Sequence, residues 1–281
     1  EMPPRIQALW AVWAVLALAA LAHAADVPGE KVKAGSSVVR ADDDGAPEGA
    51  SAGADKPKPN PILSAILSIA TPLIAQVVYY SPMEAMRKIR AEGTTGTMTA
   101  IPYSAMMTSC SIWITYGLLA GDPTIWVPNC TGAMFGAYYI YIYRKYTPVG
   151  VSLLPHYLAV GGSFVAAFII LMALPQAQAL PLVGYIGVVL VVIMFSGPLA
   201  VIQTVIKTKS TASLPPFFTA ASFCNCFVWT CYGGLIINDP FIWGPNLAGL
   251  MATLVQISLF FVYGMPPPAL PTHTELKQSA V

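Results

Sequence analysis

The sequence predicts an all-α membrane protein with seven transmembrane helices, arranged as two parallel three-helix repeats joined by a linker helix (3+1+3). Three observations lead to this prediction: long apolar blocks, basic residues on one side only, and an internal repeat. Of the 281 residues, 56% are hydrophobic and 10% are charged, whereas soluble domains carry about 25% charged residues. The hydrophobic residues form long runs instead of alternating with polar ones, which indicates membrane spans.

The N-terminal part of the chain differs from the rest. Residues 1–25 combine Arg5, an apolar run over residues 8–22 and small residues around Ala24. This is the layout of a secretory signal peptide, and a retained signal anchor or short extra helix is the alternative. Residues 26–60 mix Gly, Ala and Pro with charges and hold few bulky apolar side chains. We therefore expect a disordered extracytoplasmic tail there.

A series of apolar segments follows Pro61. Each is long enough, at 1.5 Å per residue, to cross about 30 Å of hydrocarbon. Their interiors carry no Asp, Glu, Lys or Arg. The expected spans are residues 62–83, 97–119, 123–143, 153–174, 182–206, 213–237 and 240–263.

Basic residues occur in alternate connecting segments only. The other connecting segments hold Asp122 and Asp239 and no Lys or Arg. The positive-inside rule then places the basic segments and the tail 265–281 in the cytoplasm, with the N-terminus outside or in a lumen. We expect an integral protein of the plasma membrane. The basic residues after position 61 are Arg87, Lys88, Arg90, Arg144, Lys145, Lys207, Lys209 and Lys277.

An internal repeat relates residues 81–139 to residues 196–256. Trp-x-x-Tyr-Gly, Asp-Pro and Pro-Asn-x-x-Gly recur in the same order at an offset of 116 or 117, as does a first proline, while a second proline recurs after a short length difference. Each copy covers three spans, so the first repeat is 62–146, the linker helix 153–174 and the second repeat 182–264. A single linker span keeps the two copies parallel, and parallel repeats enclose a path between them.

Several motifs within the repeat are specific to one kind of membrane protein. They are TAIPYSAMM, WITYGLLAGDP, PNCTG, SGPLAVIQTVIKTKS, LPPFF, WTCYGG and DPFIWGPNLAG. With these motifs the chain resembles the SWEET (MtN3/saliva) sugar transporters over about residues 62–264. The resemblance implies a passive, bidirectional sugar uniporter that works by alternating access.

Two prolines in each repeat are candidate hinges: Pro82, Pro102, Pro198 and Pro215. A proline inside a helix removes a backbone hydrogen bond and costs about 3 kcal/mol, which creates a weak point. The alternative is that prolines are simply common in membrane helices. The proline tetrad of the SWEET family falls on these four positions.

Asn129 and Asn246 are candidate substrate ligands. Each lies early in a span, where an unpaired amide in hydrocarbon would be costly, so it should face protein or a watery cavity. Its donors and acceptor suit sugar hydroxyls, and a helix–helix hydrogen bond is the alternative. The resemblance implies sugar binding, because the family's asparagines align with these two.

Trp113 and Trp229 occupy equivalent places in the two repeats. An indole can stack on the apolar face of a sugar ring, although tryptophan also anchors helices at the membrane interface, as we expect for Trp126 and Trp243. The resemblance places Trp113 and Trp229 in the substrate pocket. Many family members carry a smaller residue at the first of these positions, so two indoles here favour hexose over sucrose.

The gates are also implied by the resemblance. Tyr116, Tyr232 and Asp239 match outer-gate positions. The inner-gate aromatic residue that usually precedes Pro102 is replaced by Ala100.

Other functions find little support in the sequence. There is no basic-aromatic patch for nucleic acid, no catalytic triad, no phosphate-binding loop, and no cysteine spacing typical of zinc. We therefore expect no enzyme activity, no metal and no cofactor. The expected partners are a small sugar and the lipid bilayer, and assembly into a homo-oligomer is open. The alternative is a non-transporting seven-helix receptor or sorting protein of the wider PQ-loop group.

Overall fold

The structure is a computed structural model that describes residues 59–194 and 196–266. The expected signal peptide, most of the expected tail 26–60 and nearly all of the tail 265–281 lie outside the described residues. Within the described part the chain is helical. The elements are α2 (Pro61–Tyr80), α3 (Met83–Glu92), α4 (Ile101–Ala120), α5 (Pro123–Tyr146), α6 (Leu154–Ala173), α7 (Gln176–Met194), α8 (Ser196–Thr208), α9 (Pro216–Cys231), η1 (Tyr232–Ile236) and α10 (Pro240–Tyr263).

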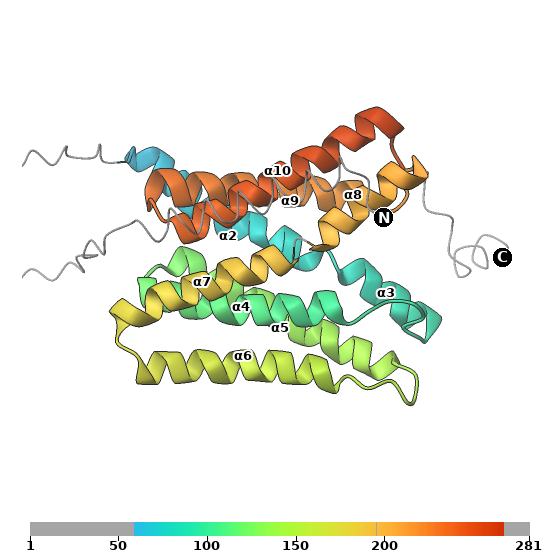
Figure 1. The fold of residues 1–281 in the computed structure, drawn as a ribbon, viewed down its shortest axis with the longest axis horizontal. Helices are drawn as coiled ribbons and strands as arrows, with labels where there is room; N and C mark the ends of the chain where they lie inside the picture. Colours follow the sequence, from blue (N-terminus) through green and yellow to red (C-terminus); the bar gives the residue numbers. More distant parts are fainter. Residues whose placement is uncertain (1–58, 195, 267–281) are drawn as a thin grey trace, which may run out of the picture.

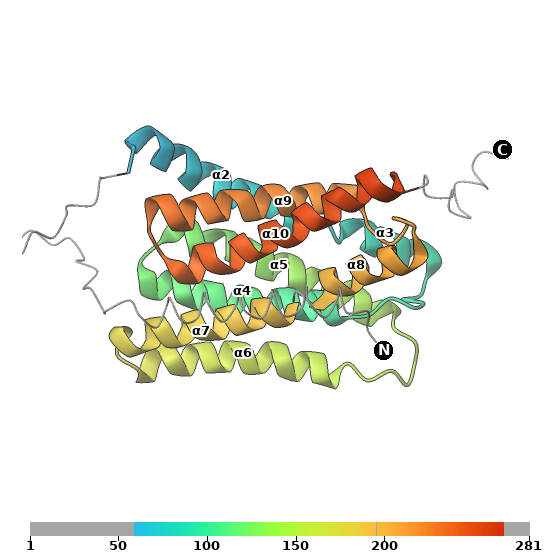
Figure 2. The same cartoon turned by 45° about the horizontal axis from the view of Figure 1, so that its top comes forward.

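The helices form two groups of three with one helix beside them, which confirms the expected fold class. In the first repeat α5 packs between α2 and α4, and in the second α10 packs between α7 and α9. The repeats meet along two equivalent contacts, α2 with α9 and α7 with α4. The linker helix α6 lies at the edge of the bundle in both views (Figures 1 and 2). Two hydrogen bonds between side chains attach α6 to α4: Ser163 accepts from Ser111, and His156 pairs with Ser104.

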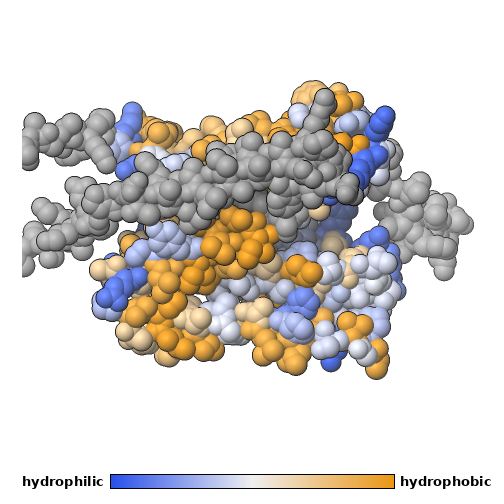
Figure 3. Space-filling view, in the orientation of Figure 1, coloured by the Kyte–Doolittle hydropathy of each residue, from blue (hydrophilic) through white to orange (hydrophobic). Residues whose placement is uncertain are grey.

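Four segments are long and apolar enough to span a membrane by length and composition: Pro61–Glu92, Leu154–Ala173, Gln176–Thr208 and Pro240–Tyr263. The other three expected spans are also helices, namely α4, α5 and α9, but they are less apolar. In α4, for example, Ser104, Ser111 and Thr115 are buried. On the face shown in Figure 3, the residues outside the grey atoms form broad hydrophobic patches, and the most hydrophilic residues lie mainly toward the two ends.

The expected hinge prolines fall at two kinds of position. Pro82 is the N-cap of α3, directly after α2 ends, and Pro198 lies in the first turn of α8, which follows α7. Pro102 is in the first turn of α4, and Pro215 is the N-cap of α9. Proline is well tolerated at a helix start because those N–H groups have no partner within the helix. Pro102 and Pro215 thus begin helices that follow non-helical segments, whereas Pro82 and Pro198 lie where one helix closely follows another, and a hinge role for the four stays a prediction.

The second repeat contains one more residue than the first in a short segment near the end of α9. Six positions separate Tyr116 from Asp122, whereas seven separate Tyr232 from Asp239. The extra residue is taken up by the π-helix η1, in which Ile237 donates its N–H to the carbonyl of Tyr232, 3.2 Å away. Single π-turns inside helices are frequent at functional sites. The widened turn allows both tyrosine–aspartate pairs to keep equivalent places.

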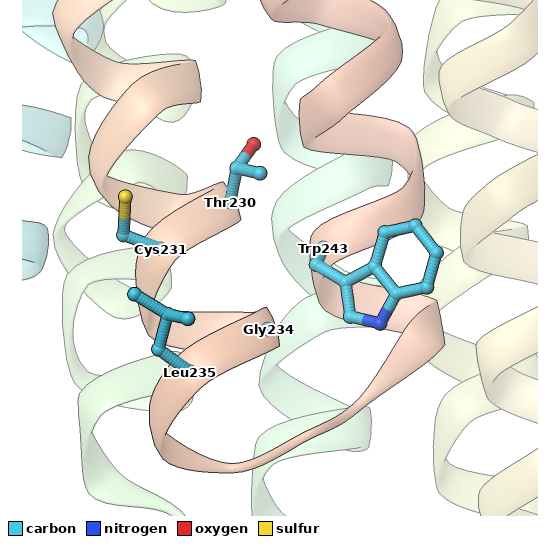
Figure 4. Close-up of a pocket in the computed structure, with 5 residues that line it drawn as sticks. All are labelled: Thr230, Cys231, Gly234, Leu235 and Trp243. Atoms are coloured by element: carbon cyan, nitrogen blue, oxygen red, sulfur yellow. The ribbon is translucent and has the colours of Figure 1, made fainter. Parts of the chain in front are cut away.

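A small cavity of about 280 Å³ lies beside this π-helix. Figure 4 shows Trp243 of α10 across from Thr230 and Gly234, with Cys231 and Leu235 on the same helical segment. The cavity therefore lies between the C-terminal end of α9, the π-helix and the first turn of α10.

Candidate functional site

Two tyrosine–aspartate hydrogen bonds join the repeats at one end of the bundle. The Tyr116 hydroxyl donates to Asp239 Oδ2 at 2.6 Å, and the Tyr232 hydroxyl donates to Asp122 Oδ2 at 2.7 Å. Each tyrosine therefore binds the aspartate of the other repeat. We call this end of the bundle, with Asp122 and Asp239, the aspartate end.

Each of these aspartates also caps the helix that follows it. Asp122 Oδ1 accepts from the backbone N–H of Thr124, and Asp239 Oδ1 accepts from that of Phe241, both at 2.9 Å. A carboxylate is favourable at a helix N-terminus, where N–H groups are otherwise unpaired. One carboxylate thus holds the start of its own helix and a tyrosine of the opposite repeat.

The opposite end of the bundle carries the basic residues. Arg144 lies 22 positions after Asp122 along α5, a distance of about 33 Å at the rise of an α-helix. Arg90 in the last turn of α3 and Lys207 in the last turn of α8 belong to the same end. We call it the basic end.

Asp122 was not among the residues selected from the sequence, although Tyr116, Tyr232 and Asp239 were. The signal was present, because Asp122-Pro123 aligns with Asp239-Pro240 in the repeat. Burial raises the pKa of the Asp239 carboxyl, while the Tyr116 hydroxyl and the N–H of Phe241 favour its charged form.

An apolar cluster made of both repeats lies beside these pairs, and we call it the closed-end cluster. Trp229 belongs to it, and Trp113 packs against it. The ring centroids of Trp113 and Tyr116 are 5.6 Å apart, and those of Trp229 and Tyr232 are 6.0 Å apart, both edge to face. The cluster brings the two expected tryptophans together around one centre. Its members are Leu67, Ile112, Tyr116, Ile125, Val183, Trp229, Tyr232 and Ile242.

Each of the other two apolar clusters among the described residues is made of residues from one side of the boundary between the repeats. One contains Met86, Ile89 and Tyr139, together with Ala100, which is 5% exposed. The other contains Ile202, Val205, Leu214 and Leu259 of the second repeat. Likewise α3 packs on α5, and α8 packs on α7 and α10. Apolar packing therefore joins the repeats at the aspartate end, whereas the basic end is packed within each repeat.

The two expected substrate asparagines have equivalent backbone contacts but different neighbours. Asn129 Nδ2 donates to the Ile125 carbonyl and Asn246 Nδ2 to the Ile242 carbonyl, each at 2.8 Å. Asn129 Oδ1 also accepts from the Tyr79 hydroxyl at 2.9 Å, so the helix–helix bond considered above is present in the first repeat. Asn129 is 6% exposed, while Asn246 is half-buried.

The repeat explains this difference between the asparagines. At the offset of 116 found around this segment, the counterpart of Tyr79 is Phe195. A phenylalanine ring has no hydroxyl group to donate. The second repeat therefore cannot reproduce the Tyr79–Asn129 bond.

Asn225 is a further polar residue that the sequence reasoning missed. Its Oδ1 is buried and has no hydrogen-bond partner, a property shared among the described side chains only with Thr108 Oγ1. It lies four residues before Trp229 on α9, so both side chains occupy one face of the helix. An amide inside a membrane span is itself the signal that could have identified it.

The fold and site together define a membrane protein with an internal two-fold repeat and a cross-linked closure at one end. A comparison with protein families identifies it further. The family described as "Sugar efflux transporter for intercellular exchange" (MtN3/saliva) matches residues 65–149 and 181–267. The chain belongs to this family, the SWEET sugar transporters, which are transporters and not enzymes.

Individual relatives agree with this assignment. The chain is 30% identical to "Sugar transporter SWEET1" of Drosophila pseudoobscura pseudoobscura over 64% of its length and 80% of the relative. It is 31% identical to "Bidirectional sugar transporter SWEET4" of Oryza sativa subsp. indica, over 67% of this chain and 75% of the relative. A solved structure of a eukaryotic SWEET transporter superposes with a TM-score of 0.67 at 25% identity, covering 72% of this chain and 97% of that one.

The cross-linked closure can be tested by removing both hydroxyl donors with Tyr116→Phe and Tyr232→Phe. A hydrogen bond to a charged group contributes about 1.5–3 kcal/mol, so losing both should favour opening of the aspartate end about tenfold or more. The readout is modification of Leu67→Cys in the closed-end cluster, in a chain without its native cysteines, by a membrane-impermeant thiol reagent. Tyr141→Phe, an exposed tyrosine on α5, is the control. An unchanged modification rate in the double variant would show that the two tyrosine–aspartate bonds do not hold the aspartate end closed.

Proposed function

We propose that this protein is a passive, bidirectional sugar uniporter that works by alternating access. The observation that carries the proposal is the one-sided closure: among the described residues, two crossed tyrosine–aspartate bonds and one shared apolar cluster join the repeats at the aspartate end only. A transporter of this kind must close one end while the other can open. Relatives that carry the name bidirectional sugar transporter support the same function.

The orientation that we propose follows from charge. The basic end faces the cytoplasm under the positive-inside rule, so the aspartate end faces the outside of a plasma membrane. The conformation described here is then closed to the outside. Because one chain holds both repeats, assembly into a homo-oligomer would place several paths side by side and would not be needed to complete one.

The sugar site that we propose lies between the repeats, where the tryptophans meet the asparagines. Trp113 and Trp229 offer apolar faces for a sugar ring. Asn246 and the unpaired acceptor of Asn225 offer hydrogen bonds to its hydroxyls. Asn129 would take part by exchanging its bond with Tyr79 for one with the sugar.

Transport should follow the sugar gradient without a proton. A proton-coupled carrier needs a titrating group within the membrane, whereas the interiors of these spans carry no Asp or Glu and His156 lies near the basic end. Uptake of labelled glucose into vesicles holding the purified chain should equilibrate and ignore a protonophore. Asn246→Ala and Asn225→Leu should slow this uptake. Accumulation against the gradient that collapses with the protonophore would contradict uniport.

We expect hexoses to be preferred over sucrose. Two indoles at the same cluster leave little room for a second ring, and overfilling a packed site costs about 1–3 kcal/mol, which is roughly a 10- to 100-fold loss of flux. In the unaltered chain the Trp113 indole fills the space against Gly187. Trp113→Ser empties this space and should therefore raise sucrose uptake relative to glucose uptake. Trp126→Ser is the matched control outside this cluster. Equal transport of both sugars by the unaltered chain would show that the size argument is wrong.

We propose hinge roles for the proline tetrad, with the main movement at the two helix breaks. Pro82→Ala and Pro198→Ala should let α2–α3 and α7–α8 run on as continuous helices and lower transport about tenfold or more, while the protein still reaches the membrane. Pro102→Ala and Pro215→Ala should have smaller effects, because α4 and α9 follow non-helical segments and have no helix directly before them to join. Pro72→Ala, inside α2, is the control. Unchanged transport by both Pro82→Ala and Pro198→Ala would contradict the hinge proposal.

A further inference from the structure

A second cavity, of about 290 Å³, lies where α4, α6 and α7 meet. The cavity adjoins the closed-end cluster, because Leu190 lines the cavity and also packs against that cluster. Thr108 lines the cavity and is five residues before Trp113 on α4, so the two side chains point about 140° apart around the helix axis. Thr108 therefore faces a different side of α4 from Trp113, whereas Ser109, which also lines the cavity, lies four residues before Trp113 and nearer to its face.

One wall of this cavity is polar. Ser104 Oγ and His156 Nδ1 are 2.9 Å apart, and the pair links α4 to α6. Thr108 Oγ1 is buried without a hydrogen-bond partner. Other threonine hydroxyls in the helices, such as those of Thr115 and Thr219, donate to the carbonyl four residues earlier. A buried hydroxyl without such a partner is costly, so Thr108 is suited to a ligand that supplies one.

The opposite wall and the mouth are apolar. Leu190, Ile193 and Met194 of α7 line the cavity. Ile101, Ile193 and Met194 are also 62%, 61% and 42% exposed. These side chains lie on membrane helices, so the mouth opens toward lipid hydrocarbon, and an occupant would enter from the bilayer.

The charge and depth of the cavity restrict that occupant further. Its lining residues include no Asp, Glu, Lys or Arg, and its one histidine, His156, is paired with Ser104, so a charged lipid head would find no permanent counter-charge. Thr108 lies seven residues into α4, about 10 Å from the start of the helix. A neutral hydroxyl can reach that depth, whereas a phosphate head stays at the membrane surface.

We propose that this cavity binds a sterol-class lipid of the membrane. The sterol hydroxyl bonds to Thr108 and to the Ser104–His156 pair, and the fused rings pack against Leu190, Ile193 and Met194. The volume is near the lower limit of ligand pockets, about 300–1,000 Å³, so the hydroxyl-bearing end enters and the remainder stays in the hydrocarbon. One rigid body with a single hydroxyl matches one polar wall opposite one apolar wall. The proposal does not depend on the sugar that is transported.

The test uses the full chain in phosphatidylcholine nanodiscs with a photoreactive cholesterol analogue. We expect saturable labelling of α4, α6 or α7 that excess cholesterol displaces. Thr108→Val keeps the side-chain shape and removes the hydroxyl, and it should weaken binding about threefold to tenfold. Leu190→Trp fills the cavity and should reduce labelling about tenfold or more. Thr204→Val, which alters an exposed threonine of α8, is the control and should bind as the unaltered chain does.

Three results would overturn the proposal. The first is labelling that does not saturate or that falls on other helices. The second is labelling that neither Thr108→Val nor Leu190→Trp reduces, with thermal unfolding confirming that at least Thr108→Val is folded. The third is displacement by diacylglycerol as effective as that by cholesterol, which would show that any lipid hydroxyl suffices.

Discussion

The double role of Asp122 and Asp239 is the constraint on which the arrangement of the two repeats depends. Each carboxylate has one oxygen on the N–H groups that begin its own helix and the other on a tyrosine of the opposite repeat. The cap fixes the position of the carboxylate, so the tyrosine meets an acceptor that is already in place. Since a hydrogen bond to a charged group is stronger than one between neutral groups, two such bonds hold the repeats together at the aspartate end.

The two repeats share their helix order, but some of their side chains and one helical turn differ. These differences lie near the proposed sugar site. The π-helix η1 has no counterpart in the first repeat, which has the regular end of α4 there. Tyr79 supports Asn129, whereas its counterpart is Phe195. Asn225 corresponds to Ser109 at the same offset. A sugar has no two-fold symmetry, so a site between two similar halves can recognise one orientation only through differences of this kind.

Polar side chains in this bundle are mostly satisfied by the helix that carries them. Hydroxyl groups bond to carbonyls three or four residues earlier, as those of Ser163, Thr230 and Thr253 do. In hydrocarbon this local pairing avoids the cost of an orphaned group. The two buried exceptions among the described residues, Thr108 and Asn225, lie beside a lipid-facing cavity and next to the tryptophan of the proposed sugar site, respectively.

The sequence by itself determined the helical class, the two repeats, their linker and the basic end, because these features follow from apolar runs, spacing and charge along the chain. The resemblance to the SWEET family, rather than spacing or charge, pointed to Tyr116, Tyr232 and Asp239. The sequence did not determine helix ends: α7 begins at Gln176, six residues before the expected span, and Pro102 and Pro215 stand at helix starts. Only the tertiary structure decided that Tyr116 binds Asp239 and not Asp122, six residues away in the chain. Spacing along a chain limits which side chains share a helix face, whereas the partner across an interface is chosen by how the helices pack.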